Sequence, residues 1–94
     1  MAKTKTRRWD AAEHLKTNKD ITAYLDAALQ DGDTAVVAAA LGDIARAKGM
    51  MQIARRAGLG RASLYKALSP DGHPEFATVL KVVRALGLKL HAAE

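Results

Sequence analysis

The sequence predicts an all-α fold built around one small core. Apolar residues recur at the helical spacing of three and four positions through most of the chain, and glycines or Asp-Gly pairs interrupt the pattern. Hydrophobic residues make up 49% of the chain but aromatic residues only 4%, so the core must consist of Ala, Leu, Val and Ile, which favours close helix packing. Ninety-four residues suit one domain. We expect this domain at 9–94, after a disordered basic tail at 1–8.

Three helices are expected in the first half of the chain. A short N-terminal helix is expected from Asp10, ending near Thr17-Asn18. Asp20 is the expected cap of a longer helix that stops at Asp31-Gly32, and Asp33 is the expected cap of a third helix that ends at Gly49. The residues expected to face the core are Ala11, Ala12, Leu15, Ile21, Tyr24, Leu25, Ala28, Leu29, Val36, Val37, Ala40, Leu41, Ile44 and Ala45.

Two short helices then meet at a glycine-bearing turn. They are expected at about 50–57 and 61–68, with Gly58 ending the first and Leu59 inside the turn. This pattern is typical of a helix-turn-helix motif, here at 50–68, and indicates DNA binding. On a helical wheel that sets Leu64 as buried, the outward residues are Ala62, Ser63, Tyr65 and Lys66. Arg61 lies closer to the buried side, but its long side chain can reach forward from the first turn.

The C-terminal part contains a loop, one helix and a short tail. Two prolines and a glycine at 69–74 predict the loop, and a helix follows at about 75–86 and ends at Gly87. Its expected buried residues are Phe76, Val79, Leu80, Val83 and Leu86. The tail at 88–91 alternates apolar and polar residues. It is either a short strand that pairs with the same segment of a second subunit or a frayed end packed by Leu88.

The charge is unevenly distributed along the chain. The net charge is +5, but residues 9–45 carry two lysines against seven acidic residues. Residues 46–70 carry six basic residues and no acidic one. A segment of this kind binds polyanions such as DNA by displacing condensed counterions. Because the basic segment coincides with the two short helices, double-stranded DNA is the expected partner.

Composition and spacing argue against several other classes of function. Without cysteine the chain has no disulfide, thiolate metal site or cysteine nucleophile, which fits a reducing cytosol. The sequence contains no apolar run of the kind that predicts a signal peptide or a membrane span, so we expect a soluble cytoplasmic protein. His14, His73 and His91 are widely separated, and Asp10, Asp20 and Asp33 are explained as helix caps. We therefore expect no catalytic residues, no metal site and no cofactor.

Several stretches of the chain also resemble known families. The spacing of Ile53-Ala54, Gly58-Leu59 and Leu64-Tyr65 resembles the Cro/lambda-repressor type of helix-turn-helix domain. Nearly the whole chain, from Trp9 to Leu90, resembles the HigA-like antitoxins, the antidote proteins of type II addiction modules. The stretches that carry this resemblance are WDAAEHLKTNKDITAYLDAALQDGD, AAALGDIARAKGM, LGRASLYKALSPDGHPEF and TVLKVVRALGLKL.

The resemblance implies a five-helix domain with an N-terminal helical extension and two activities. One is neutralisation of a RelE/ParE-type toxin, and the other is repression of the shared operon by a homodimer bound to operator DNA. Carried over by position, the base-contacting residues are the four outward residues of the wheel together with Arg61: Arg61, Ala62, Ser63, Tyr65 and Lys66. Two features depart from the usual pattern. Gly60 replaces a polar cap, and Gly49-Met50 replaces Thr-Gln. Gln52, two positions on, is therefore the candidate for the phosphate contact, and Arg55 of the basic segment is a further candidate for DNA binding.

The toxin-binding surface is less clear from the sequence. The acidic segment at 9–45 would attract a basic toxin that binds messenger RNA. Trp9 is expected either to anchor that interface or to close the first helix over the core. Two other functions remain open at this point: a stand-alone phage-type transcriptional regulator, and a protein-binding adaptor that never touches DNA.

Overall fold

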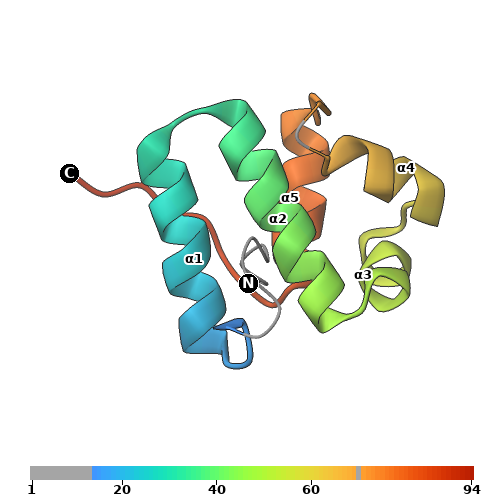
Figure 1. Ribbon diagram of the computed structural model, residues 1–94, viewed down its shortest axis with the longest axis horizontal. Helices are drawn as coiled ribbons and strands as arrows, with labels where there is room; N and C mark the ends of the chain where they lie inside the picture. Colours follow the sequence, from blue (N-terminus) through green and yellow to red (C-terminus); the bar gives the residue numbers. More distant parts are fainter. Residues whose placement is uncertain (1–13, 70) are drawn as a thin grey trace, which may run out of the picture.

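The computed structural model describes residues 14–69 and 71–94, which form five helices and no strand (Figure 1). The expected basic tail, Trp9 and most of the short helix from Asp10 lie outside the described residues. The helices are α1 (Asn18–Asp31), α2 (Thr34–Lys48), α3 (Met50–Ala57), α4 (Arg61–Ala67) and α5 (Phe76–Ala85). The all-α fold class is confirmed, and the bounds of α3, α4 and α5 agree with the expected ones to within a residue.

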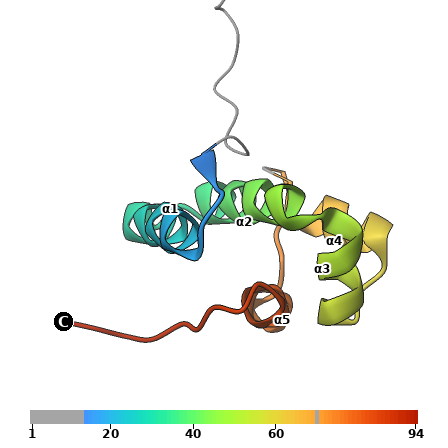
Figure 2. The same cartoon turned by 90° about the horizontal axis from the view of Figure 1, so that it is seen from below.

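The helices form two layers that α3 joins at one end. Helices α1 and α2 lie side by side as an antiparallel hairpin, and α5 lies beneath them in the second layer (Figure 2). Helix α3 spans the two layers and packs against α2, α4 and α5. After α5 the chain runs beneath α1 (Figure 2). Helix α4 is left at the edge of the molecule (Figure 1).

The core is aliphatic, as the composition predicts. Its largest fully buried side chains are Ile21, Leu41, Ile44, Ile53, Leu64, Leu68, Val82 and Val83. Three residues expected to be buried are exposed instead: Phe76 to 70%, Leu29 to 42% and Val36 to 39%. All three lie in the first or last turn of a helix. Helical periodicity gives the direction of a side chain but not how far a neighbouring element covers it.

The start of α1 differs from the expected one. Thr17, not Asp20, is the cap: its hydroxyl accepts a hydrogen bond from the Asp20 N–H at 3.0 Å, and the Asp20 carboxylate accepts one from the Thr17 N–H at 3.3 Å. This reciprocal pair is a capping box. The expected helix end near Thr17-Asn18 is therefore wrong, because Leu15 and Lys16 are not helical, although Leu15 is buried as expected. Asp33 does cap α2, accepting from the Ala35 N–H at 2.9 Å.

The C-terminal tail is packed and carries no strand. Gly87 adopts a left-handed conformation with φ 81°, and the Leu88 N–H donates to the Val83 carbonyl at 3.1 Å, which turns the chain away from α5. Leu88 and Leu90 are partly buried against the core. The segment at 88–91 forms no strand within this chain, and Leu88 packs against the core. Pairing of this segment with a second subunit stays a prediction.

A close approach between α2 and the end of α4 fixes the position of α4. A Cβ atom at Gly42 would lie 2.6 Å from the backbone oxygen of Leu68, closer than such atoms can approach. The Leu68 side chain is buried at the same place. Glycine at position 42 therefore lets the C-terminal end of α4 lie directly on α2.

We expect the substitution Gly42→Ala to destabilise the fold. Helix propensity alone favours alanine by about 1 kcal/mol, so a net loss of about 1–2 kcal/mol in the free energy of unfolding would show that the clash with the Leu68 carbonyl outweighs it. Urea unfolding measures this. Gly60→Ala is the matched control, because its φ of −69° suits any residue and its Cβ would meet only the Ser63 hydroxyl at 3.8 Å. A Gly42→Ala variant as stable as the control would contradict the close approach.

One hydrogen-bonded carboxylate ties α1 to α2. The Tyr24 hydroxyl donates to Asp43 Oδ2 at 2.6 Å, and Arg46 forms an ion pair with the other oxygen of the same carboxylate. Burial of Tyr24, its hydrogen bond to Asp43 and the negative charge of Asp43 raise the pKa of the phenol to about 12, and Arg46 opposes the shift. Tyr24 is thus held in its neutral, donating form.

We expect Tyr24→Phe to lower the free energy of unfolding at pH 7 by about 1 kcal/mol, because one hydrogen bond between helices is lost. A pKa raised on folding adds stability that is fully present below the ordinary value of 10 and is lost as the pH rises to about 12. The difference between the two proteins should therefore shrink across this interval. Urea unfolding at pH 7 and at steps above pH 10 measures it. A difference that stayed constant with pH would contradict the bond.

Candidate nucleic-acid interface

The turn between α3 and α4 has the geometry that its glycines predict. Gly58 is left-handed with φ 74°, and no atom lies within 4 Å of a Cβ built there, so the backbone conformation rather than space requires glycine. The N–H of Leu59 donates to the Ala54 carbonyl at 2.9 Å and that of Gly58 to Arg55 at 3.2 Å. Leu59 packs partly buried against the core. The α3–turn–α4 unit is compatible with a helix-turn-helix domain.

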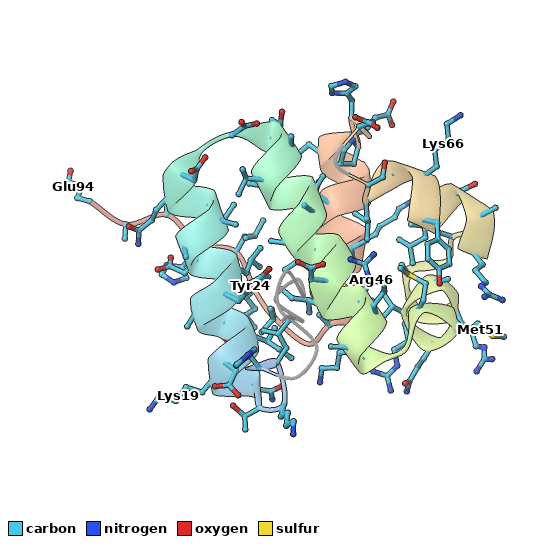
Figure 3. The ribbon with its side chains drawn as sticks, viewed as in Figure 1. Lys19, Tyr24, Arg46, Met51, Lys66 and Glu94 are labelled. Carbon is cyan, nitrogen blue, oxygen red and sulfur yellow. The ribbon has the colours of Figure 1, made fainter. Side chains whose placement is uncertain are left out.

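Burial of one side of α4 determines which residues face outward. Leu64 is 0% exposed and Leu68 2%. All five residues that the wheel and the resemblance select on this helix are exposed: Arg61, Ala62, Ser63, Tyr65 and Lys66. Figure 3 shows Lys66 projecting from α4 away from the rest of the molecule. The structure thus brings these five side chains together on the free side of one two-turn helix.

A contact with Tyr65 explains how Arg61 reaches this surface. The Arg61 guanidinium carbon lies 5.7 Å from the centre of the Tyr65 ring, one helical turn further along α4. Such a cation–π contact contributes about 0.5–1 kcal/mol at an exposed site. It directs the arginine along the outer side of the helix although its Cα lies nearer the buried side.

The first turns of α3 and α4 lack side-chain caps. Gly60 precedes α4 and Gly49, with φ 109°, precedes α3, and neither can offer a side-chain acceptor. Gln52 is exposed in the first turn of α3, and its Oε1 lies beside Gly49, 3.8 Å from the position of a Cβ there. Met51, for which the sequence predicts no role, points into solvent next to it (Figure 3). Gln52 therefore lies in the first turn of α3, two positions after the place that the usual glutamine of the pattern would take.

The six cations of the basic segment do not all belong to one surface. Arg46 is paired with Asp43 on α2. Arg56 lines a pocket of about 450 Å³ with Lys81 and Arg84, where the C-terminal ends of α3 and α5 meet. Arg55, Arg61 and Lys66 are exposed and have no ion-pair partner among the described residues. The sequence could not separate these roles, because they depend on which helix each residue faces.

The described residues contain neither a candidate metal site nor a transmembrane helix. No group of three or more His, Cys, Asp or Glu side chains within 14–69 and 71–94 is arranged to hold a metal ion. No helix in this part of the chain has the length and apolar character needed to cross a membrane.

Comparison with known proteins identifies the family. A family model described as "Probable addiction module antidote protein" matches residues 5–94. A protein of Haemophilus influenzae (strain ATCC 51907 / DSM 11121 / KW20 / Rd), described as an uncharacterized protein, is 50% identical over 86 residues, which cover 92% of this chain and 89% of that one. No solved structure matches. The chain belongs to the family of addiction module antidote proteins.

Proposed function

We propose that this protein is a HigA-like antitoxin that neutralises a RelE/ParE-type toxin and represses its own operon as a DNA-bound dimer in the cytoplasm. Family membership supports a non-enzymatic antitoxin role. DNA binding rests on one observation: α4 buries Leu64 completely and presents five exposed side chains, two of them unpaired cations, in a segment without acidic residues.

The proposed DNA complex places α4 in the major groove. Arg61 and Lys66 are long enough to reach base edges, where Arg pairs bidentately with guanine. Ser63 and Tyr65 offer hydroxyl groups, and Ala62 offers a methyl group that suits thymine. Gln52 and Arg55, on α3, contact phosphates and fix the position of the protein on the duplex. Each side chain therefore has a role that its chemistry allows.

We expect Arg61→Ala and Lys66→Ala each to weaken binding to operator DNA by about 1–3 kcal/mol if the side chain reads a base. Titration of the sequence upstream of the gene, followed by fluorescence anisotropy, measures the affinity. Lys19→Ala is the control, since Lys19 lies on α1 at the far side of the molecule from Lys66 (Figure 3).

The salt dependence of binding tests the same surface. The logarithm of the binding constant should fall with the logarithm of salt concentration, with a slope near −0.9 for each phosphate neutralised. Unchanged affinity in both α4 variants would refute the assignment of this surface. If footprinting shows no protection of the upstream DNA at any salt concentration, the protein is an adaptor rather than a repressor.

The proposed dimer forms through the tail at 88–91. Among the described residues no backbone hydrogen bond involves the segment after Leu88, so this edge can pair with a second copy. We expect a chain that ends at Gly87 to be monomeric and a chain that ends at His91 to remain dimeric, as measured by sedimentation equilibrium. Thermal unfolding checks that both retain the fold. A dimer formed by the shorter chain would exclude the tail as the contact.

A further inference from the structure

The α1–α2 hairpin carries a groove that the DNA-binding surface does not use. The groove has a volume of about 340 Å³. Its apolar lining consists of Ala27, Ala28, Val36, Ala39 and Ala40, from both helices. Figure 3 shows Tyr24 pointing from α1 towards α2, where its bond to Asp43 bounds the groove.

The lining is apolar and open to solvent. Val36 is 39% exposed, and Ala27 is exposed as well. Four of the five apolar residues are alanines, so the backbone of another segment can approach both helices closely. A partner that inserted an aliphatic side chain here would bury Val36, which the fold itself leaves uncovered.

The rim of the groove is acidic. Asp31 lines it at the end where α1 stops, and this carboxylate has no ion-pair partner among the described residues. Asp43, at the other end, is already paired with Arg46. The lining of the groove contains these two aspartates and no lysine or arginine. The apolar lining and this charge together fit a segment that is apolar on one side and basic beside it.

We infer that this groove receives a basic, amphipathic helical segment of the toxin partner, an inference that rests on the proposed antitoxin function. An aliphatic side chain of the segment packs on Val36 between the alanines, and a lysine or arginine of the segment pairs with Asp31. The groove lies between α1 and α2, and α4 lies beyond α2 at the opposite end of the molecule (Figure 1). Toxin binding therefore leaves the DNA-binding side chains uncovered.

The test compares pairs of variants that differ only in position. Val36→Arg places bulk and positive charge in the groove. Leu29→Arg does the same at a side chain of similar exposure, 42% against 39%, that lines the separate groove between α1 and the C-terminal tail. Asp31→Asn and Asp26→Asn form the second pair, because Asp26 also lines that separate groove. The probe is the purified product of the adjacent gene, titrated by calorimetry into the full-length chain.

We expect Val36→Arg to weaken toxin binding by about tenfold or more and Leu29→Arg by less than about twofold. Asp31→Asn should weaken binding by about threefold or more and reduce its salt dependence, whereas Asp26→Asn should do neither. The aspartate pair decides the question if Val36→Arg fails to fold. If the unmodified chain and all four variants bind the probe with equal affinity, the inference is overturned and the antitoxin function is left standing.

Two other results would also overturn it. If the unmodified chain binds no adjacent gene product, the antitoxin proposal fails and the inference fails with it. If Val36→Arg changes the sedimentation of the protein alone but leaves toxin binding intact, the groove joins copies of this chain or holds another part of it.

Discussion

The exposed surface of α4 depends on the burial of Leu64 and Leu68. A helix of seven residues is only about two turns long and has little stability of its own. Its rotation is therefore decided by what it buries, and both leucines are almost completely inside the core. Because Gly42 has no side chain, the last carbonyl of this segment can lie directly on α2. Once these contacts are made, the positions of Arg61, Ser63 and Lys66 on the free side follow from helical geometry.

Local features of the sequence predicted most of the helix bounds and failed where the outcome depends on side-chain geometry or on a distant residue. Gly58 and Asp33 act within a few positions along the chain, so their roles were readable. Thr17 and Asp20 also act locally, but residues of both types can cap a helix. The reciprocal hydrogen bonds that make Thr17 the cap are seen only in the structure. Phe76 lies in the first turn of α5 and is 70% exposed, which its place in the apolar pattern does not reveal. The role of Gly42 was hidden, because a glycine inside a helical pattern signals only lost stability until its contact with Leu68 is known.

The candidate site, like the helix bounds, was predictable where it depends on local residues and not where it depends on packing between helices. A helical wheel gives the correct exposed residues when its one reference residue is buried. Leu64 is buried, so the wheel identified the exposed residues of α4. Charge along the chain was a coarser guide, since Arg46 and Arg56 belong to the basic segment but face Asp43 and α5. The groove between α1 and α2 could not be predicted at all. The apolar pattern assigns Val36 to the core. In the structure its side chain is 39% exposed and lines the groove together with Asp31.

Helix α2 is shared by the two proposed surfaces and determines whether they influence each other. Its first half contributes Val36 and Ala40 to the groove, and Gly42 and Ala45 belong to the part that packs on the α3–α4 side or in the core. A toxin bound in the groove can alter the affinity for DNA only if it favours a different position of α2 relative to α4. A shift of α2 towards α4 would press Gly42 against the Leu68 carbonyl, which already lies too close for any side chain at this position. This contact opposes a shift in that direction, so the fold favours two binding events with little coupling within one chain.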